Sequence, residues 1–182
     1  LVEDLSAANG NDVGNAMAKI VRVHAYHRIT DYWGPVLYSQ FVNGELSLAS
    51  DPQENTYNDF FLTLDDAVSK LKANQGGSSY GGSDRMFGGN SAKWLKFANS
   101  LRLRLAMRIR FADPARAKTE AEKAVADGVI IDNSDNAFVS TDDVNRNPLE
   151  TITDWGEFRM SATMESILEG YGDPRMPEYF AP

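Results

Sequence analysis

The stretch Ser91–Gly128, SAKWLKFANSLRLRLAMRIRFADPARAKTEAEKAVADG, decides the fold of this chain. Its first part, up to Phe111, is rich in leucine, alanine, methionine and arginine. That composition favours a helix over the strand that the alternation in Leu101–Leu105 alone would suggest. Asp113-Pro114 stops this helix and starts a second, alanine-rich one that ends at the final glycine. Two helices joined by so short a turn must lie antiparallel or sharply angled, so the stretch predicts a helical hairpin.

The first helix of this hairpin is apolar almost all round, which is typical of a helix buried at the centre of a domain. Helical projection places Arg104 and Arg108 beside its main apolar stripe. Because a buried guanidinium needs a carboxylate partner, we expect Asp65 on a neighbouring helix to pair with them. The stripe itself consists of Trp94, Ala98, Leu101, Leu105 and Ile109.

Three further helices are predicted, over about residues 12–30, 52–75 and 162–170. Each follows a side chain that can accept a hydrogen bond from the first turn of a helix. These N-cap residues are Asn11 or Asp12, Asp51, and Ser161. The helices share a helix–turn–helix rhythm that is similar to a divergent repeat array, although no repeat is exact.

Long irregular segments separate the predicted helices, over residues 31–49, 76–84 and 132–158. Val129–Ile131 is either a short strand or an extended core segment. The segment 76–84 is rich in glycine, but it lacks a GK[ST] signature and follows a helix rather than a strand. A surface loop is therefore favoured over a phosphate site. We expect an all-α fold, with residues 1–182 forming a single helical domain.

Composition narrows the classes of function. The net charge is −8 and the sequence isoelectric point is about 4.7, so the chain repels phosphate backbones and nucleic acid is not an expected partner. The basic side chains of residues 93–110 face several directions, whereas a nucleic-acid stripe would be one-sided. The chain has no cysteine, which excludes disulfides and thiolate metal sites. It starts at Leu1 without a methionine, and we expect it to be an excised piece.

Two groups of residues have partial metal-ligand spacing, and the sequence disfavours both as metal sites. His24, His27 and Asp31 share one helix face, yet no second ligand cluster is aimed at them, so partly buried, hydrogen-bonded histidines are the favoured interpretation. The run Asp132–Asn136 is similar to the start of a calcium loop but lacks glycine at the sixth position, which favours a solvated turn. No cofactor motif and no nucleophile or acid–base motif is apparent, so neither an enzyme nor a bound cofactor is expected.

Aromatic side chains in the irregular segments are the candidate ligand contacts. Tyr32, Trp33, Tyr38 and Trp155 lie outside the predicted helical stripes. Aromatic faces on loops can stack on sugar rings, but such residues equally often fill the core from a loop, and both interpretations stay open. Trp94 lies on a helical stripe and is expected in the core.

Several long motifs resemble one family in the order in which that family carries them. The turn YWGPVLY at Tyr32–Tyr38 resembles a turn of SusD/RagB-like outer-membrane lipoproteins, and FANSLRLRLAMR at Phe97–Arg108 is very similar to one of their helices. Asp113–Gly128, Asn133–Ala137 and GDPRMPEYF at Gly172–Phe180 follow in the expected order. Together they cover most of the chain.

The resemblance implies a tetratricopeptide-like helical scaffold that is anchored by lipid on the outer-membrane surface of Gram-negative bacteria. Such proteins cap a SusC-like TonB-dependent transporter and capture glycans or other nutrients without catalysis. The lipid-bearing cysteine and the C-terminal half of the family are not in this sequence, so any membrane attachment is expected through an anchor outside it. The alternative is a helical scaffold that docks other proteins without a small ligand. A glycosidase is disfavoured because no acid–nucleophile pair is apparent.

Overall fold

The computed structural model describes residues 1–40, 47–156 and 159–180. The backbone divides into two compact units, Leu1–Val139 and Ser140–Pro182. The all-α prediction is confirmed: the described residues contain helices and no strand, apart from the isolated bridges Val36–Asp51 and Ser78–Asn90. The expectation that residues 1–182 form a single domain stays a prediction. Two of the expected irregular segments, 31–49 and 132–158, contain positions that lie outside the described residues, namely 41–46 and 157–158.

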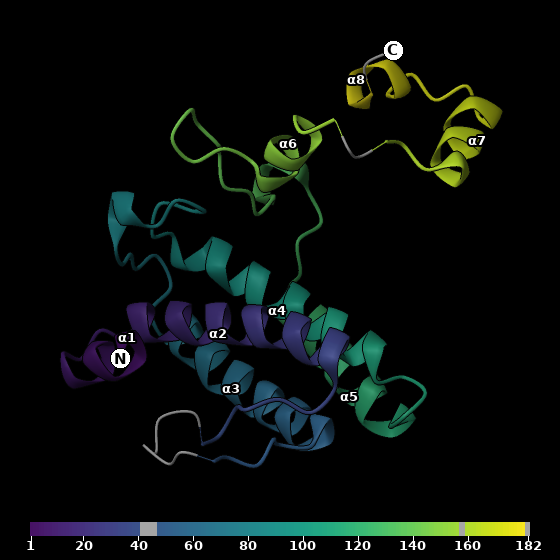
Figure 1. Cartoon of the computed structure of the whole chain (residues 1–182). Helices are drawn as coiled ribbons and strands as arrows, with labels where there is room; N and C mark the ends of the chain where they lie inside the picture. The colour runs from purple at the N-terminus through teal and green to yellow at the C-terminus, as the bar shows by residue number, and fades with distance from the viewer. Residues whose placement is uncertain (41–46, 157–158, 181–182) are drawn as a thin grey trace. The chain divides into compact units, whose positions relative to one another are not determined.

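Within the described residues, five α-helices build the first unit and three build the second (Figure 1). Those of the first unit are α1 Val2–Ala8, α2 Asp12–Trp33, α3 Gln53–Ala73, α4 Ser91–Arg108 and α5 Pro114–Asp127, with the 3-10 turns η1 Gly81–Ser83 and η2 Asn133–Asp135. Those of the second are α6 Pro148–Thr153, α7 Ala162–Gly170 and α8 Met176–Tyr179. No helix among the described ranges is long and apolar enough to cross a membrane.

Polar contacts between helices set their directions. Asp31 contacts Tyr57, Lys19 contacts Asp66 and Lys70 contacts Asn15, so α2 and α3 run antiparallel. In the same way, Asn58, Asp65 and Lys72 of α3 contact Arg116, Lys123 and Asp127 of α5 in ascending order, so these two helices run parallel. The helices α2, α3 and α4 lie side by side, with α5 against α4 (Figure 1). The resulting up–down succession forms the helical hairpins that the sequence predicts.

The core lies where the apolar faces of α2, α3 and α4 meet. Phe60, Leu64 and Leu105 are fully buried, and Trp94 is buried as expected. The stripe predicted for α4 supplies most of that helix's share of the core. Burial of these side chains, rather than helix propensity, therefore holds the unit together.

The hairpin α4–α5 forms as predicted, but its buried arginine is a different one. Asp113 caps α5 by accepting a hydrogen bond from the Arg116 amide. Arg102 is fully buried, and its Nη2 lies 2.5 Å from Oδ1 of Asp65. Arg108 is half exposed and pairs with Asp31 instead. The prediction that Asp65 holds a buried guanidinium is confirmed, whereas the choice of Arg104 and Arg108 was wrong, because the buried side of α4 is turned toward Arg102.

Several local predictions need correction. Short helices α1, α6 and α8 were not expected, because pieces of four to seven residues show too little periodicity to be recognised. The helix predicted over 12–30 continues to Trp33, so Tyr32 and Trp33 lie in its last turn rather than in a loop. Asp51 does not cap α3: it accepts hydrogen bonds from the Tyr38 and Ser39 amides. The N-cap role of Ser161 is confirmed.

Candidate functional site

A cleft of about 610 Å³ opens where the ends of α2, α3, α4 and α5 converge in the first unit. We call it the Asp31 cleft. Polar and charged side chains form much of its lining, which distinguishes it from the apolar core beside it. Its lining residues are Asp31, Gln53, Glu54, Tyr57, Asn58, Phe61, Arg108, Ile109, Ala112, Asp113 and Arg116. The lining residues at the two ends of this range, Asp31 and Arg116, are 85 residues apart in the sequence, so only the tertiary fold brings them together.

Asp31 fixes one wall of this cleft. Its Oδ1 accepts a hydrogen bond of 2.6 Å from the Tyr57 hydroxyl, and its Oδ2 lies 2.7 Å from Arg108 Nε and 3.2 Å from His27 Nδ1. Burial raises the pKa of Tyr57, and the hydrogen bond to Asp31 raises it further, so the hydroxyl stays a donor at neutral pH. Three helices are thereby tied to one carboxylate, which makes the wall rigid.

A second part of the lining is formed by Arg116 together with one face of α3. The Arg116 guanidinium lies over the Phe61 ring, 4.9 Å from its centroid, and donates to Oδ1 of Asn58. Glu54, Asn58 and Phe61 follow one another at helical spacing on α3, so they share a face. This part of the lining therefore presents a guanidinium, an amide and a carboxylate above an aromatic ring.

The structure places the four predicted ligand residues in three different surroundings. Tyr32 and Trp33 are 84% and 80% exposed, next to Asp31 in the sequence. Tyr38 is half-buried: its ring packs edge-on against Tyr26 and Phe60, and its hydroxyl contacts Arg22 and Asp59. Trp155 is 63% exposed and belongs to the second unit, just after α6.

These surroundings separate the four residues by accessibility. Tyr32 and Trp33 offer open aromatic surface at one end of the first unit, and Trp155 offers it in the second. Tyr38 instead lines a smaller polar cavity of about 340 Å³ with Ser39, Asp51 and Asp59. Burial raises the pKa of the Tyr38 hydroxyl, and the hydrogen bond to Asp59 adds to this effect.

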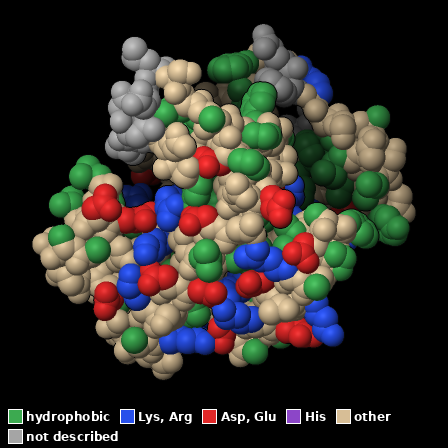
Figure 2. Space-filling model, turned by 90° about the horizontal axis from the view of Figure 1, so that it is seen from below, with side chains coloured by type: hydrophobic (Ala, Val, Ile, Leu, Met, Phe, Trp, Pro, Cys, Tyr) green, Lys and Arg blue, Asp and Glu red, His purple; other side chains and the backbone are tan. Residues whose placement is uncertain are grey.

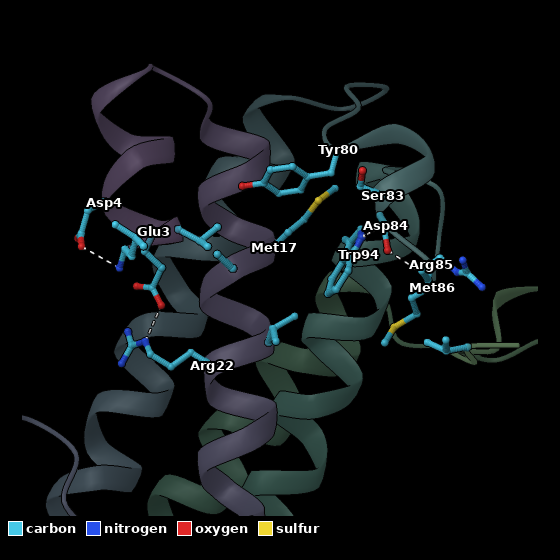
Figure 3. A pocket seen from close by; sticks show the side chains of 15 residues that line it. Glu3, Asp4, Met17, Arg22, Tyr80, Ser83, Asp84, Arg85, Met86 and Trp94 are labelled. Carbon is cyan, nitrogen blue, oxygen red and sulfur yellow. Dashed lines mark hydrogen bonds and ion pairs between the residues drawn. The ribbon is translucent and has the colours of Figure 1, made fainter. Parts of the chain in front are cut away.

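A larger cavity of about 830 Å³ is mostly apolar and lies between α1, α2 and the turn before α4. Met17, Met86 and Trp94 line it in Figure 3. Its charged groups are largely engaged: Glu3 accepts from Arg22 at 2.7 Å, and Asp84 accepts from Trp94 Nε1 at 2.7 Å. A hydroxyl-rich ligand would find few free polar groups here, so the Asp31 cleft is the better candidate.

Neither a metal site nor a one-sided stripe of basic side chains is found in the described parts of the chain. No group of three His, Asp or Glu side chains there is placed to hold a metal ion. His27 is buried with one nitrogen on Asp31, and burial lowers its pKa more than this contact raises it. Figure 2 shows Lys and Arg side chains interspersed with Asp and Glu rather than gathered by sign. The expectation of hydrogen-bonded histidines is therefore confirmed for Nδ1 of His27 and wrong for His24, whose buried Nδ1 has no partner among the described residues.

Sequence reasoning missed Asn58, Arg116 and Glu54 as cleft residues. The available signal was the helical spacing of Glu54 and Asn58, which leads to Phe61 at the edge of the apolar stripe of α3. Nothing local indicates that the α4–α5 turn would bring Arg116 to this side. The pairing of these two elements is a tertiary feature.

Comparison with known proteins identifies the family. The family model for SusD-like proteins, described as SusD and RagB outer membrane lipoproteins, matches residues 2–182. Members of this family are non-catalytic carbohydrate-binding lipoproteins. A comparison with curated proteins finds no match.

Solved structures of SusD homologues are similar in sequence and in fold. A chitin-binding SusD homologue from Flavobacterium johnsoniae shares 42% identity with a TM-score of 0.88, over 95% of this chain and 38% of the homologue. A SusD homologue from Bacteroides uniformis ATCC 8492 shares 40% identity with a TM-score of 0.79, over 86% and 33%. A SusD-like protein from Bacteroides thetaiotaomicron VPI-5482 shares 35% identity with a TM-score of 0.84, over 91% and 35%.

The chain spans about a third of the length of these solved relatives. Their helical, tetratricopeptide-like architecture agrees with the hairpins of the first unit. The family model matches almost the whole sequence, and the three solved structures share 35–42% sequence identity with this chain. This chain therefore belongs to the SusD-like family of outer-membrane lipoproteins.

Proposed function

We propose that this chain is part of a surface lipoprotein that captures a glycan without chemical change and delivers it to a SusC-like TonB-dependent transporter. Family membership supports this proposal, and so does the chitin-binding relative at 42% identity. The observation in the chain itself that carries the proposal is the exposed pair Tyr32–Trp33 at the end of α2. Exposed aromatic rings on a rigid helix end can stack on sugar rings with little loss of side-chain entropy.

Trp33 and Tyr32 are the stacking contacts in the first unit, and Trp155 is a separate candidate contact within the second unit. Tyr38 is a weaker candidate, because its ring packs on Tyr26 and Phe60 and its hydroxyl is already engaged. Selectivity then comes from neighbouring hydrogen-bonding groups. Attachment to the outer membrane through a lipid anchor and exposure on the cell surface are part of this proposal, and membership of an outer-membrane lipoprotein family supports them.

Calorimetric titration with neutral oligosaccharides, starting with N-acetylchitohexaose, tests the binding. Burial of about 60 Å² of indole at about 25 cal/mol per Å² contributes about 1.5 kcal/mol, so Trp33→Ala should weaken binding about tenfold. Tyr32→Ala should also weaken binding. Tyr171→Ala is its matched control, because Tyr171 is 86% exposed and is not a proposed contact. Absence of binding to any glycan by the wild-type protein would remove the carbohydrate assignment.

The delivery step needs a separate experiment, because a docking scaffold without a small ligand is the alternative. Capture of the transporter by the tagged wild-type protein supports delivery. Trp33→Ala should retain the transporter but lose uptake of the glycan. If uptake is unchanged in that variant, the docking role without a ligand is favoured.

A further inference from the structure

We propose that the Asp31 cleft is a saccharide subsite that takes a neutral, hydroxyl-rich sugar ring. The inference rests on the proposed function and goes beyond it by assigning a second set of contacts, distinct from the exposed aromatic rings. The cleft volume of about 610 Å³ lies within the range of about 300–1,000 Å³ that is usual for small-molecule sites. It therefore has room for a sugar ring with its substituents.

Free hydrogen-bonding groups of both kinds face this volume. Asn58 uses its Oδ1 for Arg116, and its amide Nδ2 has no partner among the described residues. Gln53 donates through Nε2 to the Thr30 carbonyl at 2.7 Å, which leaves its Oε1 as an acceptor. The carboxylate of Glu54 forms no ion pair or hydrogen bond within the described ranges and is exposed. Sugar hydroxyls both donate and accept, so they can satisfy an amide donor and a carboxylate acceptor together.

The charges of the cleft favour a neutral sugar over an acidic one. Arg108 is neutralised by Asp31 at 2.7 Å. Arg116 is the remaining guanidinium, and it shares the lining with the carboxylates of Glu54 and Asp113. A uronate or a sulfated sugar would meet at least as many negative charges as positive ones, which opposes its binding. Neutral sugars escape this repulsion.

The walls of the cleft are held in place before any ligand arrives. Tyr57 and Arg108 are bound to Asp31, and Arg116 is held by Phe61 and Asn58. Apolar surface from Ile109 and Ala112 completes the lining and suits the C–H side of a sugar ring. Groups that are already ordered lose less entropy on binding.

Calorimetry on the full chain tests the subsite with N-acetylchitohexaose, cellohexaose and maltohexaose as neutral probes and hexagalacturonate as the acidic probe. Asn58→Ala and Glu54→Gln each remove one proposed contact, and each should weaken binding of the preferred neutral probe about tenfold. Asn9→Ala is the matched control: Asn9 is exposed at the end of α1 and lines none of the three cavities described above, so binding should change less than twofold. Glu54 is exposed, so its variant tests the subsite even if Asn58→Ala loses stability.

The outcomes separate the subsite from the function that it rests on. If the wild type binds a neutral probe and both cleft variants behave like Asn9→Ala, the subsite is wrong and glycan capture stands. If the wild type binds none of the neutral probes, both proposals fall. Tighter binding of hexagalacturonate than of every neutral probe would overturn the assignment of a neutral sugar.

Discussion

Replacing Asp65, which pairs with the buried Arg102, should destabilise the first unit more than replacing Arg102 and Glu120 together by neutral side chains. Arg102 is fully buried, with Nη2 2.5 Å from Asp65 and Nη1 3.4 Å from Glu120. Breaking a buried ion pair costs about 3–5 kcal/mol, whereas an exposed pair contributes about 0–1 kcal/mol. Because the Asp65 side chain is 39% exposed and Glu120 remains, Asp65→Leu should cost about 2 kcal/mol, between these limits.

The comparison variant replaces Arg102 itself, so no buried guanidinium is left without a carboxylate. In Arg102→Met combined with Glu120→Gln, both buried charges disappear, and Asp65 keeps Lys123 and solvent. Such replacements of buried charges by groups of similar size are often neutral, so this double variant should stay within about 1 kcal/mol of the wild type. Urea unfolding followed by circular dichroism measures the free energy of unfolding of both variants. An unchanged m-value shows that each variant exposes as much surface on unfolding as the wild type.

Acid provides an independent check of the same pair. Burial raises the pKa of Asp65, but Lys123 and Arg102 outweigh that effect and hold the pKa below its usual range. A carboxylate whose pKa is lowered by folding stabilises the fold above its unfolded pKa, near 4, and this contribution is lost as the pH falls through the folded pKa. The wild type should therefore lose more stability below pH 4 than Asp65→Leu does. If the double variant is less stable than Asp65→Leu at neutral pH, the reasoning is refuted.

Three further changes test other parts of the structure. Phe60→Ala empties a fully buried site and should cost about 3–5 kcal/mol in urea unfolding, whereas a cost below 1 kcal/mol would mean that α2 and α3 are not packed as described. Asp113→Ala removes the cap of α5 and should cost about 1 kcal/mol, and Asp113→Asn should restore most of it. His27 has its pKa lowered by burial, so the unfolded chain binds the proton more readily and stability should fall as the pH drops below 6.5. His27→Gln should show a smaller loss over the same pH range, and an equal loss in both proteins would contradict this assignment.

Much of the helical framework was predictable because it depends on local chemistry. Asp113-Pro114 and Gly128 bound α5 as expected, and Ser161 caps α7. The sequence predicts an end near residue 30, whereas α2 continues to Trp33, directly before the stop signal Gly34-Pro35. The Asp31 side chain, bound to Tyr57 and Arg108, supports the extra turn from other helices. Contacts of that kind have no local signature.

The candidate site divides in the same way. Tyr32 and Trp33 were predicted as ligand contacts from their residue type and position, and this stays a prediction, since the structure shows only that both rings are open. The Asp31 cleft was not predicted, because Asn58 and Arg116 are ordinary polar residues until α3 and α5 run parallel and bring them together. Proximity between distant residues is decided by packing.

The sequence by itself determined that the chain is helical, where the α4–α5 hairpin turns, and to which family it belongs, because periodicity, caps and long motifs are local properties of the chain. Only the tertiary structure decided that Arg102 rather than Arg104 or Arg108 is buried on Asp65, and that four helix ends enclose a polar cleft around Asp31. The physical reason is that helical periodicity shows which residues share a face, whereas the rotation of each helix follows from how the whole core packs.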